Sequence, residues 1–199
     1  MKKTLLLTLL LVISFATALR AQGDFHLGFI QNTLNTKTTT VVGNITSSTM
    51  QIGEYAGFSY NIDLNHNFGL LIGAEAEHFS ISDTAGLLTG KTMLINVNVP
   101  VMLNFSLRFR KVRLTAFGGL SMNMGIVSNT KIESIGEIDN YADVEIMDRY
   151  SWGLNYGARL SYGKIGVHAM WLYGLTDLNK SDNIETTSSR MMVGVDIQF

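Results

Sequence analysis

The chain has 199 residues, 15 basic against 16 acidic side chains, a formal net charge of −1 and no cysteine. This length suits one domain, and the slight acidity argues against a nucleic-acid partner, which would need a basic face. The lack of cysteine excludes disulfides, a thiol nucleophile and a lipid attached to cysteine. One proline, 19 glycines and 16% charged residues suit an all-β protein better than a helical soluble enzyme.

The first expected element is a secretory signal peptide. Two lysines precede an almost wholly apolar stretch at 5–15, and small residues follow up to Ala21. About 11 apolar-rich residues are too few to cross a bilayer as a helix, and this order of basic, apolar and small residues is typical of a cleaved signal. We expect residues 1–21 to be removed, although a cut after Ala18 also fits the cleavage rule, and 22–199 to form the mature domain.

After the signal, polar and apolar residues alternate. Between Met93 and Phe105 every odd-numbered position is apolar, whereas asparagine occupies positions 96, 98 and 104. Positions i and i+2 of a strand face the same side, so this segment has an apolar face and an amide-rich face. Similar segments occur near residues 24–33, 51–62, 68–80, 93–105, 113–127, 150–162, 164–176 and 189–199. We therefore expect eight strands.

The polar faces of these strands also carry charged residues. A soluble sandwich or lipocalin-like barrel would bury these charges in a dry core at a prohibitive cost in free energy. Its apolar faces, if exposed to water instead, would promote aggregation. The sequence instead predicts an all-β, eight-stranded antiparallel up-and-down transmembrane β-barrel with its apolar faces in lipid. Side chains fill the interior of so small a barrel, so charges there must pair. We expect a structural salt-bridge network of Glu75, Glu77, Arg113, Arg159, Arg190 and Asp196.

Connections and aromatic residues indicate how the barrel lies in the membrane. Short connections are expected at 63–67, 106–112 and 163–164, and long ones at 34–50, 81–92, 128–149 and 177–188. Barrels of this class have longer loops outside, so both termini are expected in the periplasm. Trp152 and Tyr162 lie on one apolar face, separated by roughly 25 Å along the membrane normal, which matches the height of the apolar band with an aromatic residue at each interface.

Few residues suggest chemistry. The four histidines, His26, His66, His78 and His168, form no metal-binding motif, so neither a metal nor a cofactor is expected. His78 lies near Ser80 and Ser82 toward the outer rim, where an enzyme acting on outer-leaflet lipid would place its base and nucleophile. A serine and a histidine close together are common in any sequence, so enzymatic activity stays a minor alternative. A proton or ion path through the interior charges is another.

Several motifs resemble the Bacteroidetes-type outer-membrane β-barrel domain, the small "porin family" of PorT-like proteins, over essentially all of residues 22–199. They are Ala21-Gln22, Gly53 to Phe58, Phe68-Gly69-Leu70 with Glu75 following, Asn96 to Leu103, Phe117 to Ser121, Tyr173 to Asp177, and Phe199. The resemblance implies the barrel fold and the bacterial outer membrane, and it brings no catalytic residues. It also implies that Phe199 is an assembly signal read by the barrel-assembly machinery.

The expected function is that of a non-enzymatic structural or interaction scaffold without an open pore. Its expected partners are outer-membrane lipid, the barrel-assembly machinery during biogenesis, and an extracellular or envelope protein bound by the outer loops. No nucleic acid is expected among them. The alternatives are a narrow transport channel, or a component of an outer-membrane translocation complex, and thirdly an outer-leaflet lipid-modifying enzyme.

Overall fold

The computed structural model describes residues 21–40, 43–85, 88–132, 136–139, 148–179 and 183–199. Apart from Ala21, the expected signal peptide lies outside this range. Within the described residues, no helix has the length and apolar character needed to cross a membrane.

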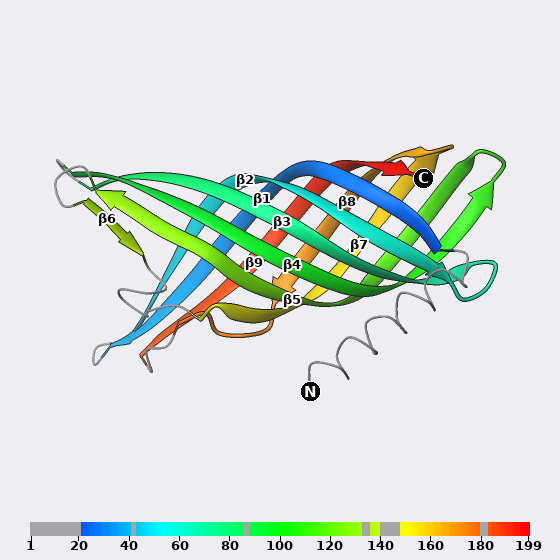
Figure 1. Ribbon diagram of the computed structural model, residues 1–199. Helices are drawn as coiled ribbons and strands as arrows, with labels where there is room; N and C mark the ends of the chain where they lie inside the picture. The colour runs from blue at the N-terminus through cyan, green and yellow to red at the C-terminus, as the bar shows by residue number, and fades with distance from the viewer. Residues whose placement is uncertain (1–20, 41–42, 86–87, 133–135, 140–147, 180–182) are drawn as a thin grey trace, which may run out of the picture.

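Eight long strands of the described chain wind into a closed antiparallel barrel (Figure 1). Each long strand pairs with its neighbours in sequence, and pairing of the first strand with the last closes the ring. A ninth, short strand pairs only with the end of β5. This confirms the predicted eight-stranded up-and-down barrel. The strands are β1 (Ala21–Thr40), β2 (Gly43–Asp63), β3 (Phe68–Ala85), β4 (Leu88–Phe109), β5 (Val112–Ile132), β6 (Gly136–Asp139), β7 (Tyr150–Tyr162), β8 (Ile165–Gly174) and β9 (Ile184–Gln198).

The end of the barrel that holds Phe199 and the start of β1 also carries three short turns (Figure 1). Two of them are two-residue hairpins with a residue at positive φ, Arg110 at 55° and Gly163 at 62°, as such tight turns require. The connection predicted at 106–112 is therefore shorter than expected, because β4 and β5 stay paired as far as Phe109 and Val112.

The opposite end differs from the prediction more strongly. β1 and β2 stay paired as far as Thr40 and Gly43, across the predicted loop 34–50, and β3 and β4 stay paired across most of the predicted loop 81–92. The loop prediction was wrong there because the alternation of polarity ends where lipid ends, whereas backbone pairing continues into water. Threonine, which is frequent in this part of β1, favours strands.

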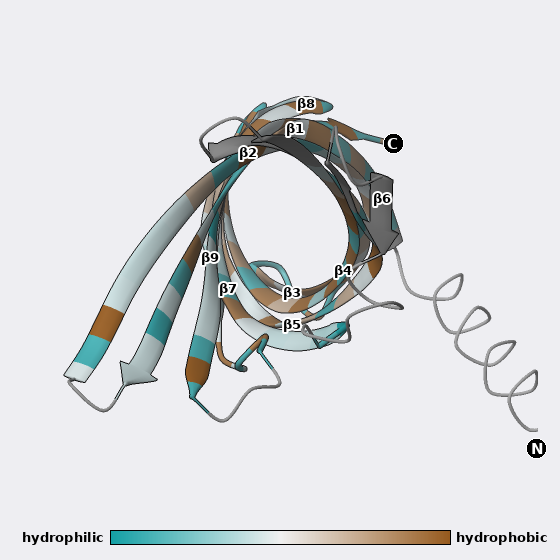
Figure 2. Cartoon of the chain, turned by 90° about the vertical axis from the view of Figure 1, so that its left-hand side faces the viewer, coloured by the Kyte–Doolittle hydropathy of each residue, from teal (hydrophilic) through white to brown (hydrophobic). Residues whose placement is uncertain are grey.

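Burial alternates along the strands as the sequence predicts. The outward-facing Phe29, Ile52 and Leu103 are 73%, 67% and 60% exposed, whereas the inward-facing Glu77 and Asp196 are completely buried. Figure 2 looks along the barrel axis at the ring of strands that separates these two environments. The distribution is the reverse of that in a soluble protein, as lipid around a barrel requires.

The interior is not uniformly polar, which the sequence analysis did not predict. A cluster of buried apolar and aromatic side chains lies on the inward faces, between the charged groups. It consists of Ile30, Tyr55, Leu71, Phe79, Met102, Phe117, Met170 and Met192.

Candidate functional site: the charged interior of the barrel

The largest set of ion pairs centres on Arg159 of β7. Its Nη1 lies 2.7 Å from Asp24 Oδ2 on β1, and its Nη2 lies 3.2 Å from Asp196 Oδ1 on β9. All three side chains are at least nine-tenths buried. A guanidinium shared by two carboxylates compensates the charge of both groups where water is excluded. Arg159 therefore ties strands at both ends of the chain to one another.

A histidine extends this set toward β2. His168 Nδ1 lies 2.9 Å from Asp196 Oδ2, and its Nε2 is hydrogen-bonded to the Tyr55 hydroxyl. Because a carboxylate only accepts, Nδ1–H donates to Asp196; with the ring neutral, the Tyr55 hydroxyl donates to Nε2. Tyr55 has to cross β1 and β9 to reach β8. Gly194 leaves the space for it, because a Cβ on Gly194 would collide with the Tyr55 hydroxyl.

A second carboxylate–histidine contact lies beside Arg159. His26 Nε2 is 3.2 Å from Glu75 Oε1, and Asn98 Nδ2 donates to Glu75 Oε2 at 2.7 Å. Glu75 on β3 thus meets β1 and β4.

The third set centres on Glu77, which is fully buried. Arg190 Nη1 lies 2.9 Å and 2.7 Å from the two carboxylate oxygens, and Asn123 Nδ2 lies 3.4 Å from one of them. Arg190 Nε donates to Ser188, whose hydroxyl donates to Asn32 at 2.7 Å. The set therefore connects β3, β5, β9 and β1 across the interior.

Arg113 lies apart from these three sets. It is the second residue of β5, half-buried, and its Nη1 donates to Gln22 Oε1 at 3.1 Å. The structure thus brings four of the six expected network residues, Glu77, Arg159, Arg190 and Asp196, into ion pairs, places Glu75 against His26, and leaves Arg113 at the turn end of the barrel.

The two expected interface aromatics and Phe199 lie on the outer face. Trp152 and Tyr162 are 51% and 66% exposed, near opposite ends of β7. Phe199 is 64% exposed, packs against Phe58 with 5.6 Å between ring centroids, and lies over Gly23.

A small cavity of about 20 Å³ adjoins the Arg159 set. Only about one water molecule fits a space of that size. It is lined by His26, Leu71, Glu75, Met102, Phe117, Arg159, His168, Met170 and Asp196. Within the described part of the chain, no group of three or more His, Cys, Asp or Glu side chains could hold a metal ion. The interior is thus suited to holding strands together, and it has little room for a ligand beside these groups.

Sequence reasoning did not place Asp24, His26, Tyr55 or His168 in the interior sets. For the first two a signal existed, because they alternate with the apolar Phe25 and Leu27 at the start of β1. Tyr55 carries no such signal, because an aromatic residue on an inward face looks like ordinary packing.

Comparison with solved structures finds similar chains among outer-membrane proteins. The crystal structure of Ail, the attachment invasion locus protein of Yersinia pestis, aligns with 14% identity over 90% of this chain and 99% of that one, with a TM-score of 0.47. Neisserial surface protein A aligns with 14% identity over 88% and 97%, with a TM-score of 0.43. The outer membrane protease OmpT of Escherichia coli aligns with 9% identity over 90% and 96%, with a TM-score of 0.47.

No curated protein sequence matches the chain. The family described as outer membrane protein beta-barrel domain, however, matches residues 15–180, which is most of the chain. With the closed barrel and its inside-out surface, this match leads to one conclusion: the chain belongs to the outer membrane protein β-barrel domain family and is a protein of the bacterial outer membrane.

Proposed function

We propose that the protein is an outer-membrane scaffold that presents an extended β-sheet outside the cell to a protein partner and conducts no solute. The observation that carries this proposal is the sheet formed by β2, β1 and β9, which continues beyond the barrel (Figure 2). β1 pairs with β9 as far as Thr38 and Ile184, and with β2 as far as Thr40 and Gly43.

The outer edge of β2 supports a protein partner. β2 pairs with β3 only from Gly53 to Asp63, so within the described residues no strand lies beside its edge from Gly43 to Ile52. The side chains from Gly43 to Met50 are all exposed. An unpaired edge offers a row of backbone donors and acceptors to an added strand, which is a common way of binding an extended peptide.

The filled interior supports the absence of conduction. The three ion-pair sets and the apolar cluster occupy the inward faces, and breaking a buried ion pair to open a path would leave an uncompensated charge. Eight-stranded barrels generally have only enough interior for side chains.

The edge is tested by photo-crosslinking in living cells. A photoreactive amino acid at Thr46 is expected to give discrete protein adducts, and the same residue at His66, in the turn between β2 and β3 at the opposite end, is expected to give none of the same mass. Adducts at Thr46 should disappear when a proline at Ser48 or Met50, whose amides face the unpaired side of β2, removes an edge amide. A lack of adducts along all of 43–52 would refute the partner proposal.

Conduction is tested in planar bilayers. We expect no steady single-channel conductance from the purified protein. A steady conductance that Arg159→Ala or Glu75→Ala changes would instead favour the narrow channel or a place in a translocation complex.

We also propose that the chain is a PorT-like member of its family, exported through a cleaved signal peptide at 1–21. The motifs quoted above support the first point, and the basic-apolar-small order of the N-terminus supports the second. The intact mass of the protein purified from outer membranes tests the cleavage, and retention of residues 1–21 would contradict it.

A further inference from the structure

One carboxylate–histidine contact of the barrel lies on its outer surface. Glu54 of β2 and His78 of β3 are directly opposite each other in the sheet, with 3.0 Å between Glu54 Oε1 and His78 Nδ1. Their side chains are 69% and 40% exposed, and the outward-facing neighbours on the side of the membrane centre, Ala56 and Ala76, are apolar. Ionisable residues on a lipid-facing surface are unfavourable and usually have a function.

The height of the pair corresponds to the outer leaflet. Glu54 and His78 lie eight residues along their strands from the paired Ile62 and Leu70, next to the turn between β2 and β3. At about 3.3 Å per residue and a tilt near 40°, this is roughly 20 Å along the membrane normal, in an apolar band about 25 Å tall. Polar groups of outer-leaflet lipids lie at the upper boundary of that band.

The hydrogen bond to Glu54 fixes the role of each imidazole nitrogen. Because the carboxylate accepts, Nδ1–H of His78 donates to it, and Nε2 is left as the basic nitrogen. Ser80 lies two residues after His78 on β3, about 6.6 Å along the strand. Its side chain is exposed on the same outward face. In enzymes with a serine nucleophile, a carboxylate commonly orients a histidine, and the second nitrogen of that histidine accepts the proton of the serine hydroxyl.

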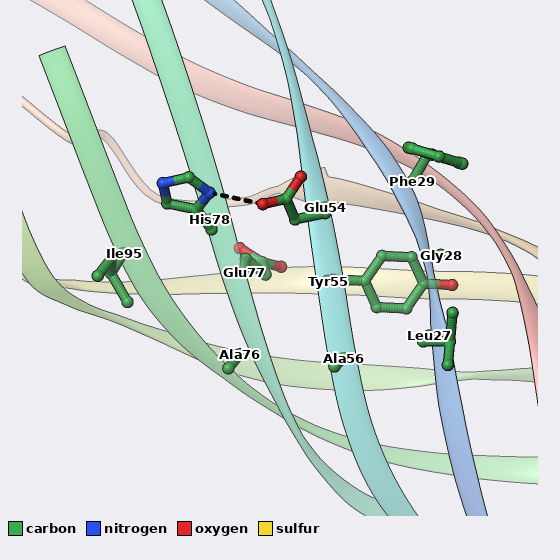
Figure 3. A pocket seen from close by; sticks show the side chains of 10 residues that line it. All are labelled: Leu27, Gly28, Phe29, Glu54, Tyr55, Ala56, Ala76, Glu77, His78 and Ile95. Carbon is green, nitrogen blue, oxygen red and sulfur yellow. Dashed lines mark hydrogen bonds and ion pairs between the residues drawn. The ribbon is translucent and has the colours of Figure 1, made fainter.

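A groove runs from this pair toward the membrane centre (Figure 3). Its volume is about 490 Å³, within the usual range of ligand sites. The small Ala56 and Ala76 form its floor, Leu27 and Phe29 line one side, and Ile95 lines the other. A chain of methylene groups in this groove would have its polar end at Glu54 and His78. This is the orientation of an acyl chain in the outer leaflet.

We propose that Glu54, His78 and Ser80 form a hydrolytic site for the acyl esters of outer-leaflet lipids. Ser80 Oγ adds to the ester carbonyl carbon while His78 Nε2 accepts its proton. The bond from that carbon to the alcohol oxygen then breaks, and His78 returns the proton to the leaving alkoxide. Water, deprotonated by His78, next attacks the acyl-serine, which releases the fatty acid and restores Ser80. Glu54 is the positioning residue that holds the imidazole.

This site is separate from the edge of β2 that the proposed function invokes, so each proposal can fail alone. The test uses the full mature protein refolded into vesicles, with phospholipid in one arm and lipopolysaccharide in the other. Free fatty acid is measured by mass spectrometry, and Ser80 is monitored by labelling with a fluorophosphonate. We expect release in at least one arm, and the arm identifies the lipid class.

Matched variants assign the residues. Ser80→Ala and His78→Ala should lower release by about 10²- to 10⁴-fold, the range of general acid–base catalysis. Ser189→Ala, on the outward face of β9, and His66→Ala, in the turn between β2 and β3, should leave release unchanged. All variants should keep heat-modifiable gel migration, which reports a folded barrel.

Glu54 needs a readout of its own. Glu54→Gln should lower release and alter its pH profile, and Glu54→Asp should restore part of the activity because a carboxylate can again accept from Nδ1–H. Three outcomes would overturn the proposal: no fatty acid from either lipid, no label on Ser80, or equal release by folded Ser80→Ala.

Discussion

The contact between Arg190 and Glu77 gives the sharpest test of how the interior stabilises the barrel. The perturbation is Arg190→Met, which keeps much of the side-chain length and removes the charge. Glu77 is then a fully buried carboxylate whose remaining hydrogen bond is the one from Asn123 at 3.4 Å. Removing one partner of a buried pair costs about 3–5 kcal/mol, because an uncompensated charge remains.

The matched control is the pair Arg108–Asp63 near the turn end, with 3.4 Å between its atoms and side chains 35% and 28% exposed. Solvent screens this pair, so Arg108→Met should cost about 0–1 kcal/mol. Glu77→Gln combined with Arg190→Met removes both charges. The double variant should be more stable than the sum of the single effects predicts, by about 1.5–3 kcal/mol.

The assay is urea unfolding of the barrel from lipid vesicles, followed by gel migration and tryptophan fluorescence. The slope of the free energy against urea has to stay constant between variants for the comparison to hold. A cost below about 1 kcal/mol for Arg190→Met, or strictly additive effects in the double variant, would refute the view that this pair compensates a buried charge.

Three further predictions concern the strands themselves. Gly194→Ala should destabilise the barrel by about 1–3 kcal/mol, because its Cβ would collide with the Tyr55 hydroxyl and the Leu27 carbonyl oxygen. Gly118→Ala should cost far less, because its Cβ would meet its nearest neighbour at an ordinary 3.5 Å; urea unfolding compares them, and equal costs would contradict the close packing around Gly194. Phe199→Ala should slow assembly in cells and raise the fraction of unfolded protein, which is the fraction whose gel migration does not change on heating. Unchanged assembly would contradict the role of Phe199 as an assembly signal. In a Trp171→Phe background, Trp152 fluorescence should be quenched more by lipids brominated near the headgroup than by lipids brominated in mid-chain, and the reverse order would contradict an interfacial position.

Much of the fold follows from the alternation of polarity, because a strand between lipid and a packed interior has to satisfy two environments at once. The segment from Met93 to Phe105 predicts both its strand and its faces for that reason. The same reasoning fails at 34–50, because a strand with water on both faces needs no alternation.

The pairing partners of the interior charged residues could not be predicted from the sequence, for a different reason. Alternation of polarity indicates which face of the sheet a residue occupies. The position of that residue along the barrel axis depends on strand tilt and register, which are set by the number and pairing of all the strands. Glu75 and Glu77 are two residues apart on one face, yet one meets His26 and the other meets Arg190. No local pattern distinguishes them.

The crossing of Tyr55 over β1 and β9 has a consequence for the order of folding. β1 and β9 come together only when the two ends of the chain meet, and Tyr55 and His168 lie on opposite sides of that seam. The contact of Arg159 with Asp24 spans the same seam. These bonds cannot form until β1 and β9 have paired, so they stabilise the closed barrel and not the intermediates that precede closure. Weakening them should hasten its opening and leave the rate of its first insertion unchanged.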